Sequence, residues 1–246
     1  MSEDLSSRLA GIEERIQKAC DRAGRDRGDV RLVAVTKTWP PEIVNEAIRE
    51  GLRLLGENRV QEALAKAPLC SSAEWHLIGP LQRNKIRHAL SLFTTLHSID
   101  SLDVLRDLAR ISAETGARPD VLLEVNVADE ATKHGFSPTS VREAVETVLA
   151  DGELRLVGLM TIPPWVPEGE KSRPHFRKLR EVRDGLEHDY GISLPELSMG
   201  MSSDFETAIE EGATFVRIGT ALFGNRVGKA WKPTFTPDSD SYWNQV

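Results

Sequence analysis

Eight short apolar segments alternate along this chain with segments whose apolar residues have helical spacing. Residues 121–127 form a nearly continuous apolar run, whereas Leu102, Leu105 and Leu108 recur every three residues. A short apolar run predicts a strand buried on both faces, and a repeat of three or four residues predicts an amphipathic helix. The predicted strands are residues 32–35, 52–55, 75–80, 93–99, 121–127, 154–162, 197–199 and 214–219.

This alternation is typical of a parallel sheet, and eight such units in 246 residues fit a (β/α)8 barrel. We predict an α/β fold, a single TIM-type barrel with an extra N-terminal helix over residues 4–24. The main alternative is an open doubly wound sheet, whose dinucleotide-binding form is disfavoured because no Gly-x-Gly-x-x-Gly follows the first strand. We assign residues 1–226 to the barrel and residues 227–246 to a surface or loosely ordered polar tail.

Composition excludes several classes of function. The net charge of −7 argues against nonspecific nucleic-acid binding, which needs basic clusters. Cys20 and Cys70 lie far apart with no His or Cys at ligand spacing, so we expect neither a disulfide framework nor a metal site. The N-terminus lacks the apolar run of a signal peptide and no segment has the length of a transmembrane helix. We therefore expect a cytoplasmic protein.

Lys37 is the first candidate functional residue. It follows the apolar run Leu32–Val35 and precedes Pro40 and Pro41, which cannot continue a strand. One interpretation is that Lys37 marks the point at which the strand reaches water. The other is that it is a carbonyl-trapping amine, whose pKa is lowered by desolvation so that it can form a Schiff base.

The ends of the other strands favour the second interpretation. In a (β/α)8 barrel the functional face lies at the C-terminal ends of the strands, and the loops after strands seven and eight commonly bind phosphate. The predicted strand ends place the following residues, most of them polar or glycine, at this face: Lys37, Asn58, Gly79, Asn126, Met160, Thr161, Ser198, Met199, Gly200, Arg217, Ile218, Gly219 and Thr220.

The last two loops offer backbone amides for an anion. Gly219 and Thr220 could hold a phosphate, although the glycine could equally serve only a tight turn. Ser203 and Glu206 have the spacing of a helix capping box, which is compatible with anion binding because both use free amides.

Arg217 interrupts an apolar strand, where an unpaired guanidinium would be costly. Its neighbours Val216 and Ile218 should face the covering helices, which leaves Arg217 in the barrel mouth, paired with a carboxylate, a ring nitrogen or a phosphate. We interpret His76 and His97 as core or rim histidines with satisfied hydrogen bonds, since no metal-ligand partner is suitably spaced.

Six motifs occur together in this chain: Ala34–Thr38 (AVTKT), Gly56–Glu62 (GENRVQE), Trp75–Lys85 (WHLIGPLQRNK), Gly158–Met160 (GLM), Leu197–Asp204 (LSMGMSSD) and Arg217–Thr220 (RIGT). With these motifs the chain resembles the pyridoxal phosphate homeostasis proteins, which look like the barrel domain of alanine racemase standing alone. The resemblance extends from about residue 5 to about residue 226, and the set of motifs is highly specific.

The resemblance implies a covalent cofactor site for pyridoxal 5′-phosphate (PLP) without catalytic or metal-binding residues. It places Lys37 as the lysine that forms the internal aldimine, and Arg217 at the pyridine nitrogen. It implies phosphate binding by Ser203, Gly219 and Thr220, and lining of the ring by Asn58, Met160, Ser198 and Met199. The chain departs from the family pattern at Arg59, where tyrosine is frequent, and at Trp39, where lysine is frequent, which leaves open the role of those positions in handing the cofactor on.

The resemblance favours a carrier over a catalyst. An arginine cannot supply a proton to the ring nitrogen, so the pyridine stays neutral and is a poor electron sink. Alanine racemase adds a second base from a separate β domain, and this chain ends before such a domain could begin. We therefore expect a monomeric, non-catalytic PLP-binding protein that serves PLP homeostasis and delivery to PLP-dependent apo-enzymes, and so affects amino-acid and keto-acid balance. The alternatives are a PLP-dependent racemase or decarboxylase of a small amino acid, and a cofactor-free Schiff-base aldolase.

Overall fold

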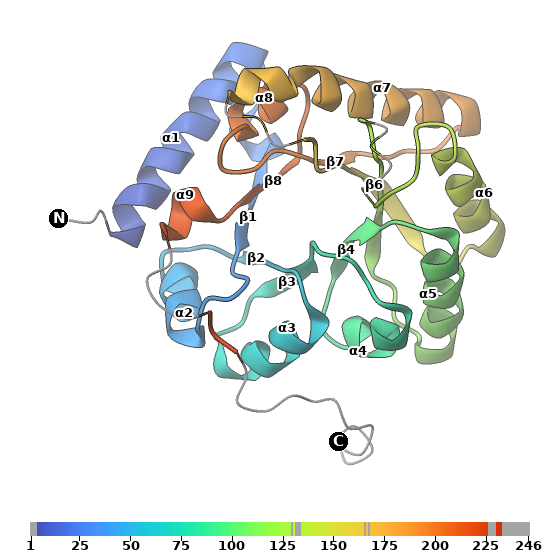
Figure 1. Cartoon of the computed structure of the whole chain (residues 1–246), viewed down its shortest axis with the longest axis horizontal. Helices are drawn as coiled ribbons and strands as arrows, with labels where there is room; N and C mark the ends of the chain where they lie inside the picture. Colours follow the sequence, from blue (N-terminus) through green and yellow to red (C-terminus); the bar gives the residue numbers. More distant parts are fainter. Residues whose placement is uncertain are drawn as a thin grey trace.

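Parallel strands form a closed barrel with helices around it (Figure 1). The computed structural model describes residues 4–128, 130, 134–164, 166, 168–225 and 230–232. Within this part of the chain the strand order is sequential, and β1 pairs in parallel with both β2 and β8. The predicted barrel is thereby confirmed. The strands are β1 (Arg31–Val35), β2 (Leu54–Glu57), β3 (Glu74–Leu77), β4 (Thr95–Ile99), β5 (Asp120–Glu124), β6 (Arg155–Met160), β7 (Glu196–Ser198) and β8 (Phe215–Ile218).

The helices form the outer layer of the barrel. The predicted N-terminal helix is confirmed as α1, which is capped by the Asp4 side chain and ends at Gly24 in the left-handed region. Figure 1 shows α1 packed beside α8 and α9. The helices are α1 (Leu5–Ala23), α2 (Pro41–Arg49), α3 (Val60–Lys66), α4 (Ile86–Leu90), α5 (Leu102–Thr115), α6 (Val141–Asp151), α7 (Arg173–Tyr190), α8 (Phe205–Glu210) and α9 (Thr220–Phe223).

Apolar side chains fill two regions. The larger lies between the strands and the helices and contains Val216 and Ile218, as the alternation in β8 predicts. The smaller is formed by Val33, Val35, Ile78 and Phe215. Residues two apart on a strand share a face, so Phe215 and Arg217 lie on the opposite side of β8 from Val216 and Ile218. Arg217 therefore lies inside the barrel, as predicted.

The second strand lies two residues later than predicted, at Leu54–Glu57 instead of 52–55. Gly56, expected in the exit loop, pairs with His76 of β3 inside the sheet. A Cβ at position 56 would lie 2.9 Å from the Val33 side chain, so the crowded barrel requires glycine here. As a result Glu57 is a fully buried strand residue.

The predicted capping box at Ser203 and Glu206 is wrong. Helix α8 begins at Phe205, and its N-cap residue is Asp204, whose side chain accepts a hydrogen bond from Met201 N. The Glu206 carboxylate instead pairs with Arg15 of α1 at 2.7 Å. Tertiary packing of α1 on α8 therefore overrides the local capping signal.

The predicted tail, residues 227–246, lies outside the described residues except for residues 230–232, so its boundary stays a prediction. No helix in the described part of the chain is long and apolar enough to cross a membrane. The same part contains no cluster of three His, Cys, Asp or Glu residues that could hold a metal ion.

Candidate functional site

A cavity of about 690 Å³ opens at the C-terminal ends of the strands. Lys37, in the loop that follows β1, and Arg217 of β8 both line it. The other lining residues are Val35, Asn58, Ile78, Gly79, Pro80, Glu124, His134, Ile162, Met201, Ser202, Ser203, Gly219, Thr220 and Ala221. The face that the sequence predicted to be functional therefore contains a cavity.

The cavity brings together six of the nine predicted site residues, namely Lys37, Asn58, Ser203, Arg217, Gly219 and Thr220. The other three, Met160, Ser198 and Met199, do not line it. They are completely buried at the ends of β6 and β7. Ser198 nevertheless contacts the cavity through Arg217, whose Nη1 donates to its backbone oxygen at 2.8 Å and to its hydroxyl at 2.6 Å.

Lys37 is exposed, so burial does not desolvate its amine, contrary to the expectation from the sequence. It lies two residues beyond the end of β1, where the chain has already left the sheet. The next residue, Thr38, has a φ of 65°, the one positive value at a non-glycine residue in the described chain. Such a conformation persists only where surrounding contacts hold it.

A buried ion cluster supplies those contacts. The carboxylate of Glu62 accepts a hydrogen bond from Thr38 N, and Lys66 Nζ donates to Thr36 O at 2.9 Å. Lys66 Nζ also lies 2.6 Å from Glu57 Oε1 and 3.1 Å from Glu62 Oε1. The cluster therefore anchors the backbone on both sides of Lys37.

The cluster contains two carboxylates and one ammonium. Burial raises the pKa of Glu57 from 4.5 to about 7, and the negative charge of Glu62 adds to this effect, although Lys66 opposes it. A proton held at Glu57 leaves the cluster electrically neutral. Trp231 covers it from outside, since its ring centroid lies 5.3 Å from Lys66 Nζ and its backbone N donates to Thr38 O at 3.0 Å.

Arg217 is the most unusual charged residue of the cavity. It is only 4% exposed, and no carboxylate of the described residues lies within ion-pair distance of it. Its hydrogen bonds within the described chain go to neutral acceptors, namely the backbone oxygen and hydroxyl of Ser198 and Thr161 O at 2.9 Å. Burial lowers its pKa to about 10, against the effects of Glu124 and Asp204, so the guanidinium remains charged at neutral pH. A buried cation with this environment is suited to an electron-rich ligand.

The loops before α8 and α9 face the same cavity. No acceptor among the described residues takes the backbone N–H groups of Ser202, Ser203 and Thr220. The Ser202 hydroxyl accepts from Gly219 N at 3.3 Å and from Ala221 N at 3.2 Å, which ties the two loops together. Amides of this kind can bind an anion such as a phosphate.

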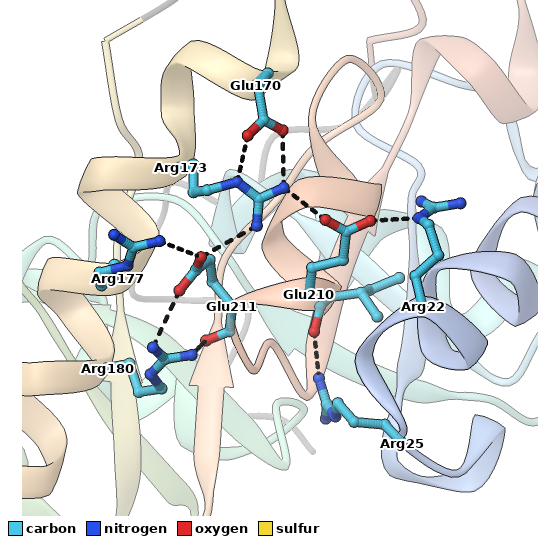
Figure 2. A network of polar contacts seen from close by, with 9 residues as sticks. Arg22, Arg25, Glu170, Arg173, Arg177, Arg180, Glu210 and Glu211 are labelled. Carbon is cyan, nitrogen blue, oxygen red and sulfur yellow. Dashed lines mark hydrogen bonds and ion pairs between the residues drawn. The ribbon is translucent and has the colours of Figure 1, made fainter.

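Helix α8 is held in place by a network of arginines and glutamates (Figure 2). Glu210 and Glu211 lie at its C-terminal end, where negative charge is unfavourable to the helix dipole unless cations compensate it. Glu211 contacts three arginines of α7, and Glu210 contacts one arginine each from α1 and α7. These arginines are Arg173, Arg177 and Arg180 for Glu211, and Arg22 and Arg173 for Glu210. The network fixes the helix that follows the loop of Ser202 and Ser203.

The two residues that depart from the family pattern lie at different places. Trp39 packs on α9, with its ring centroid 5.6 Å from that of Phe223. Arg59 is exposed and lines a second hollow of about 440 Å³ with Gln82 and Lys85, next to the main cavity. Asn58 and Pro80 line both hollows.

Several residues at the site were not found by sequence reasoning. Among them are three buried ionisable residues, Glu57 of β2 and Glu62 and Lys66 of α3, for which the sequence analysis gave no role. Ser202 is adjacent to the predicted Ser203, but its position between two loops depends on the tertiary structure. Glu124, the last residue of β5, and His134, in the loop beyond it, also line the cavity, and the sequence offered no signal for either.

Comparisons with known proteins define the class. The profile of the family described as alanine racemase, N-terminal domain, matches residues 8–227. The alanine racemase of Clostridium difficile 630 shares the fold, with a TM-score of 0.70 at 16% identity, covering 92% of this chain and 58% of that chain. The protein is thus a barrel of the alanine racemase N-terminal type.

Two further relatives define the family. The pyridoxal phosphate homeostasis protein of Aquifex aeolicus is 48% identical over 221 residues, which is 89% of this chain and 97% of that protein. PipY of Synechococcus elongatus PCC7942, whose solved structure has PLP bound, is 36% identical with a TM-score of 0.78, covering 90% of this chain and all of that chain (100%). The chain belongs to the family of pyridoxal phosphate homeostasis proteins.

Proposed function

We propose that this protein binds PLP covalently at Lys37 and serves as a non-catalytic carrier in intracellular PLP homeostasis and delivery. The observation that carries the proposal is Arg217, a buried cation with no carboxylate partner among the described residues, in the same cavity as the exposed Lys37. Ser203, Gly219 and Thr220 line that cavity too, and the amides of Ser203 and Thr220 are free for a phosphate. The residues present therefore fit an aldehyde, a ring nitrogen and a phosphate in one molecule.

Each part of the site has a role in this proposal. PLP would supply an aldehyde, and Lys37, the lysine among the described residues of the cavity, is the amine that would hold it. Arg217 would donate to the ring nitrogen and, with a pKa of about 10, keeps its own proton. Asn58 would line the ring, with Met160 and Ser198 buried beneath it, whereas Met199 packs in the apolar layer between strands and helices and would not contact the ring. The name and bound ligand of the relatives support the same assignment.

The second candidate is a PLP-dependent racemase or decarboxylase of a small amino acid. Glu124 and His134 line the cavity and could exchange protons with a substrate. Burial raises the pKa of Glu124, and the nearby Asp100 adds to this effect. The carrier is the better supported function because Arg217 leaves the ring nitrogen unprotonated, which weakens PLP as an electron sink.

The test is the absorption spectrum of the purified protein with added PLP, before and after borohydride. The wild type and Lys85→Ala, which alters the neighbouring hollow, should show a visible band that reduction fixes onto Lys37. Lys37→Ala should show none. Absence of the band from the wild type would refute the PLP proposal, and would leave the cofactor-free aldolase to be tested by trapping a carbonyl substrate.

Incubation of the PLP-loaded protein with amino acids separates the two candidates. The carrier gives neither racemisation nor decarboxylation, and it restores the activity of a PLP-dependent apo-enzyme. Turnover in the wild type that Glu124→Gln abolishes would establish an enzyme instead. We further propose that the carrier is a cytoplasmic monomer, which sedimentation and cell fractionation would test.

A further inference from the structure

A continuous chain of hydrogen bonds runs through the barrel from the cavity to its opposite end. Arg217 Nη1 lies 2.6 Å from Ser198 Oγ, which lies 2.7 Å from His97 Nδ1. His97 Nε2 lies 2.9 Å from His76 Nδ1, and His76 Nε2 lies 3.2 Å from Glu74 Oε1. Glu74 begins β3 at the N-terminal end of the barrel with a side chain 47% exposed. The other four residues of the hydrogen-bond chain are buried, namely His76, His97, Ser198 and Arg217.

The two ends of this chain fix the direction of every bond in it. Arg217 can only donate, so Ser198 Oγ accepts from it and retains its own proton to donate. The ionised Glu74 can only accept, so His76 carries a proton on Nε2. A neutral His97 that accepts from Ser198 at Nδ1 carries its proton on Nε2 and donates it to His76, which therefore accepts at Nδ1. Each of the four hydrogen bonds is consequently donated in the direction from Arg217 towards Glu74.

His97 is neutral in this arrangement. Burial lowers the pKa of His97 well below its ordinary value of 6.5, and the charge of Arg217 acts in the same direction. The Glu74 carboxylate is ionised near neutral pH, since its hydrogen bond from His76 lowers its pKa. A second donor, Thr94 Oγ1, lies 3.0 Å from the same oxygen of Glu74.

We propose that this chain of hydrogen bonds positions Arg217. Glu74 sets the direction in which each hydrogen bond is donated, and His76, His97 and Ser198 transmit that direction to Arg217. With its proton committed to His97, the Ser198 hydroxyl presents only its lone pairs to the guanidinium. Arg217 is then held from behind by Ser198 and Thr161, and its remaining N–H groups are left for the cavity. The inference rests on the proposed function in one respect, namely that the cavity ligand is PLP.

The alternative direction shows why Glu74 is required. If the carboxylate were a neutral amide, that group could rotate and donate to His76 Nε2. His76 and His97 would then donate from Nδ1, and the Ser198 hydroxyl would receive two donors instead of one. Both lone pairs of the hydroxyl would then be taken by Arg217 and His97, and its own proton would lose His97 as its acceptor.

Nitrogen-15 NMR of the histidines, on the protein without PLP, tests the direction of the chain. His76 and His97 should both carry their proton on Nε2 in the wild type. Glu74→Gln should move part of both populations to the Nδ1–H form. The matched control is Glu196→Gln. The Glu196 carboxylate pairs with Arg31 and accepts a hydrogen bond from Thr214, and it makes none of the hydrogen bonds between Arg217 and Glu74. This control should retain the wild-type tautomers.

Binding of PLP labelled at the ring nitrogen tests the positioning role. Glu74→Gln should weaken PLP binding about two- to fivefold, the difference between a charge-assisted and a neutral hydrogen bond. It should also shift the ring-nitrogen resonance, while Glu196→Gln leaves both unchanged. Equal affinity and equal resonance in the two variants would overturn the proposal, as would an Nδ1–H tautomer of His97 in the wild type.

The two proposals fail separately. If PLP does not bind the wild type, the proposed function fails, yet the histidine tautomers still report whether the chain has the stated direction. If PLP binds and the tautomers do not respond to Glu74→Gln, only the positioning device fails. A variant that does not fold gives no tautomer signal, and the wild-type tautomers then decide the question alone.

Discussion

Lys66 Nζ lies 2.6 Å from a carboxylate oxygen of Glu57, and both side chains are 0% exposed. Glu62 shares the same ammonium and also accepts the N–H of Thr38, next to Lys37. The backbone that presents the candidate Schiff-base lysine therefore rests on a buried ion cluster. Charge balance in that cluster should control both stability and the position of the loop.

Removing the ammonium should destabilise the protein strongly. Lys66→Met leaves two buried carboxylates without a cation, and loss of one partner of a buried pair costs about 3–5 kcal/mol of unfolding free energy. The control is Lys18→Met, which removes an exposed i,i+4 partner of Glu14 and should cost at most about 0.5 kcal/mol. Urea denaturation of the three proteins measures both values, and equal midpoints for the two variants would contradict the cluster's role.

Glu57 should make the protein less stable as the pH rises. Its pKa is raised by burial to about 7 in the folded state, against 4.5 as its ordinary value, so between these limits the folded state binds more protons than the unfolded state. The free energy of unfolding should therefore fall from pH 4.5 to pH 7, by on the order of 2–3 kcal/mol from this group.

His97 has the opposite effect: because burial lowers its pKa, its contribution makes the free energy of unfolding rise with pH below pH 6.5. The contribution of Glu57 is therefore measured as the difference between the wild type and Glu57→Gln at each pH. That difference should decrease with rising pH. A difference that stays constant would show that folding does not raise the pKa of Glu57.

The network on α8 should be sensitive to the charge of Glu211. This carboxylate is 5% exposed and contacts three arginines, which would repel one another without it. We expect Glu211→Gln to lower the free energy of unfolding by about 2 kcal/mol and the affinity for PLP with it. Glu206→Gln removes a single, 35% exposed contact of the same helix and should cost below about 1 kcal/mol. Thermal melts with and without PLP would reveal whether the two variants differ.

Gly79 should tolerate no side chain. A Cβ at this position would lie 2.5 Å from the backbone oxygen of Asn58, which lines the cavity. Gly79→Ala should cost about 1–3 kcal/mol and reduce PLP binding, because the Asn58 loop must move. In α7, a Cβ at Gly185 would meet nothing within 4 Å, and Gly185→Ala should stabilise the protein by about 0.5–1 kcal/mol. Unchanged PLP affinity in Gly79→Ala would show that the loop adapts.

The barrel could be predicted because each strand and helix is encoded locally. The apolar run of β1 and the repeat of Leu102, Leu105 and Leu108 in α5 carry their periodicity in adjacent residues. Strand ends were less certain, as β2 shows. Its end depends on whether Glu57 is buried, and that depends on Lys66 reaching back from the far end of α3.

The site likewise has a part that could be predicted from the sequence and a part that could not. Lys37, Asn58, Ser203, Arg217, Gly219 and Thr220 follow strand ends, and the closed barrel brings those ends to one cavity. The capping box at Ser203 was wrong because α1 competes for Glu206. His76 and His97 were correctly taken as satisfied core residues, but their partners lie on other strands.

By itself, the sequence of this protein determined the number and kind of its secondary elements, and which polar residues stand at the strand ends. Local periodicity and steric limits on the backbone are sufficient for that. Only the tertiary structure decided which charges are buried and what balances them, as with Lys66 between Glu57 and Glu62 and with Arg217 above Ser198. The physical reason is that burial and hydrogen-bond direction depend on groups from several strands, which meet only when the barrel closes.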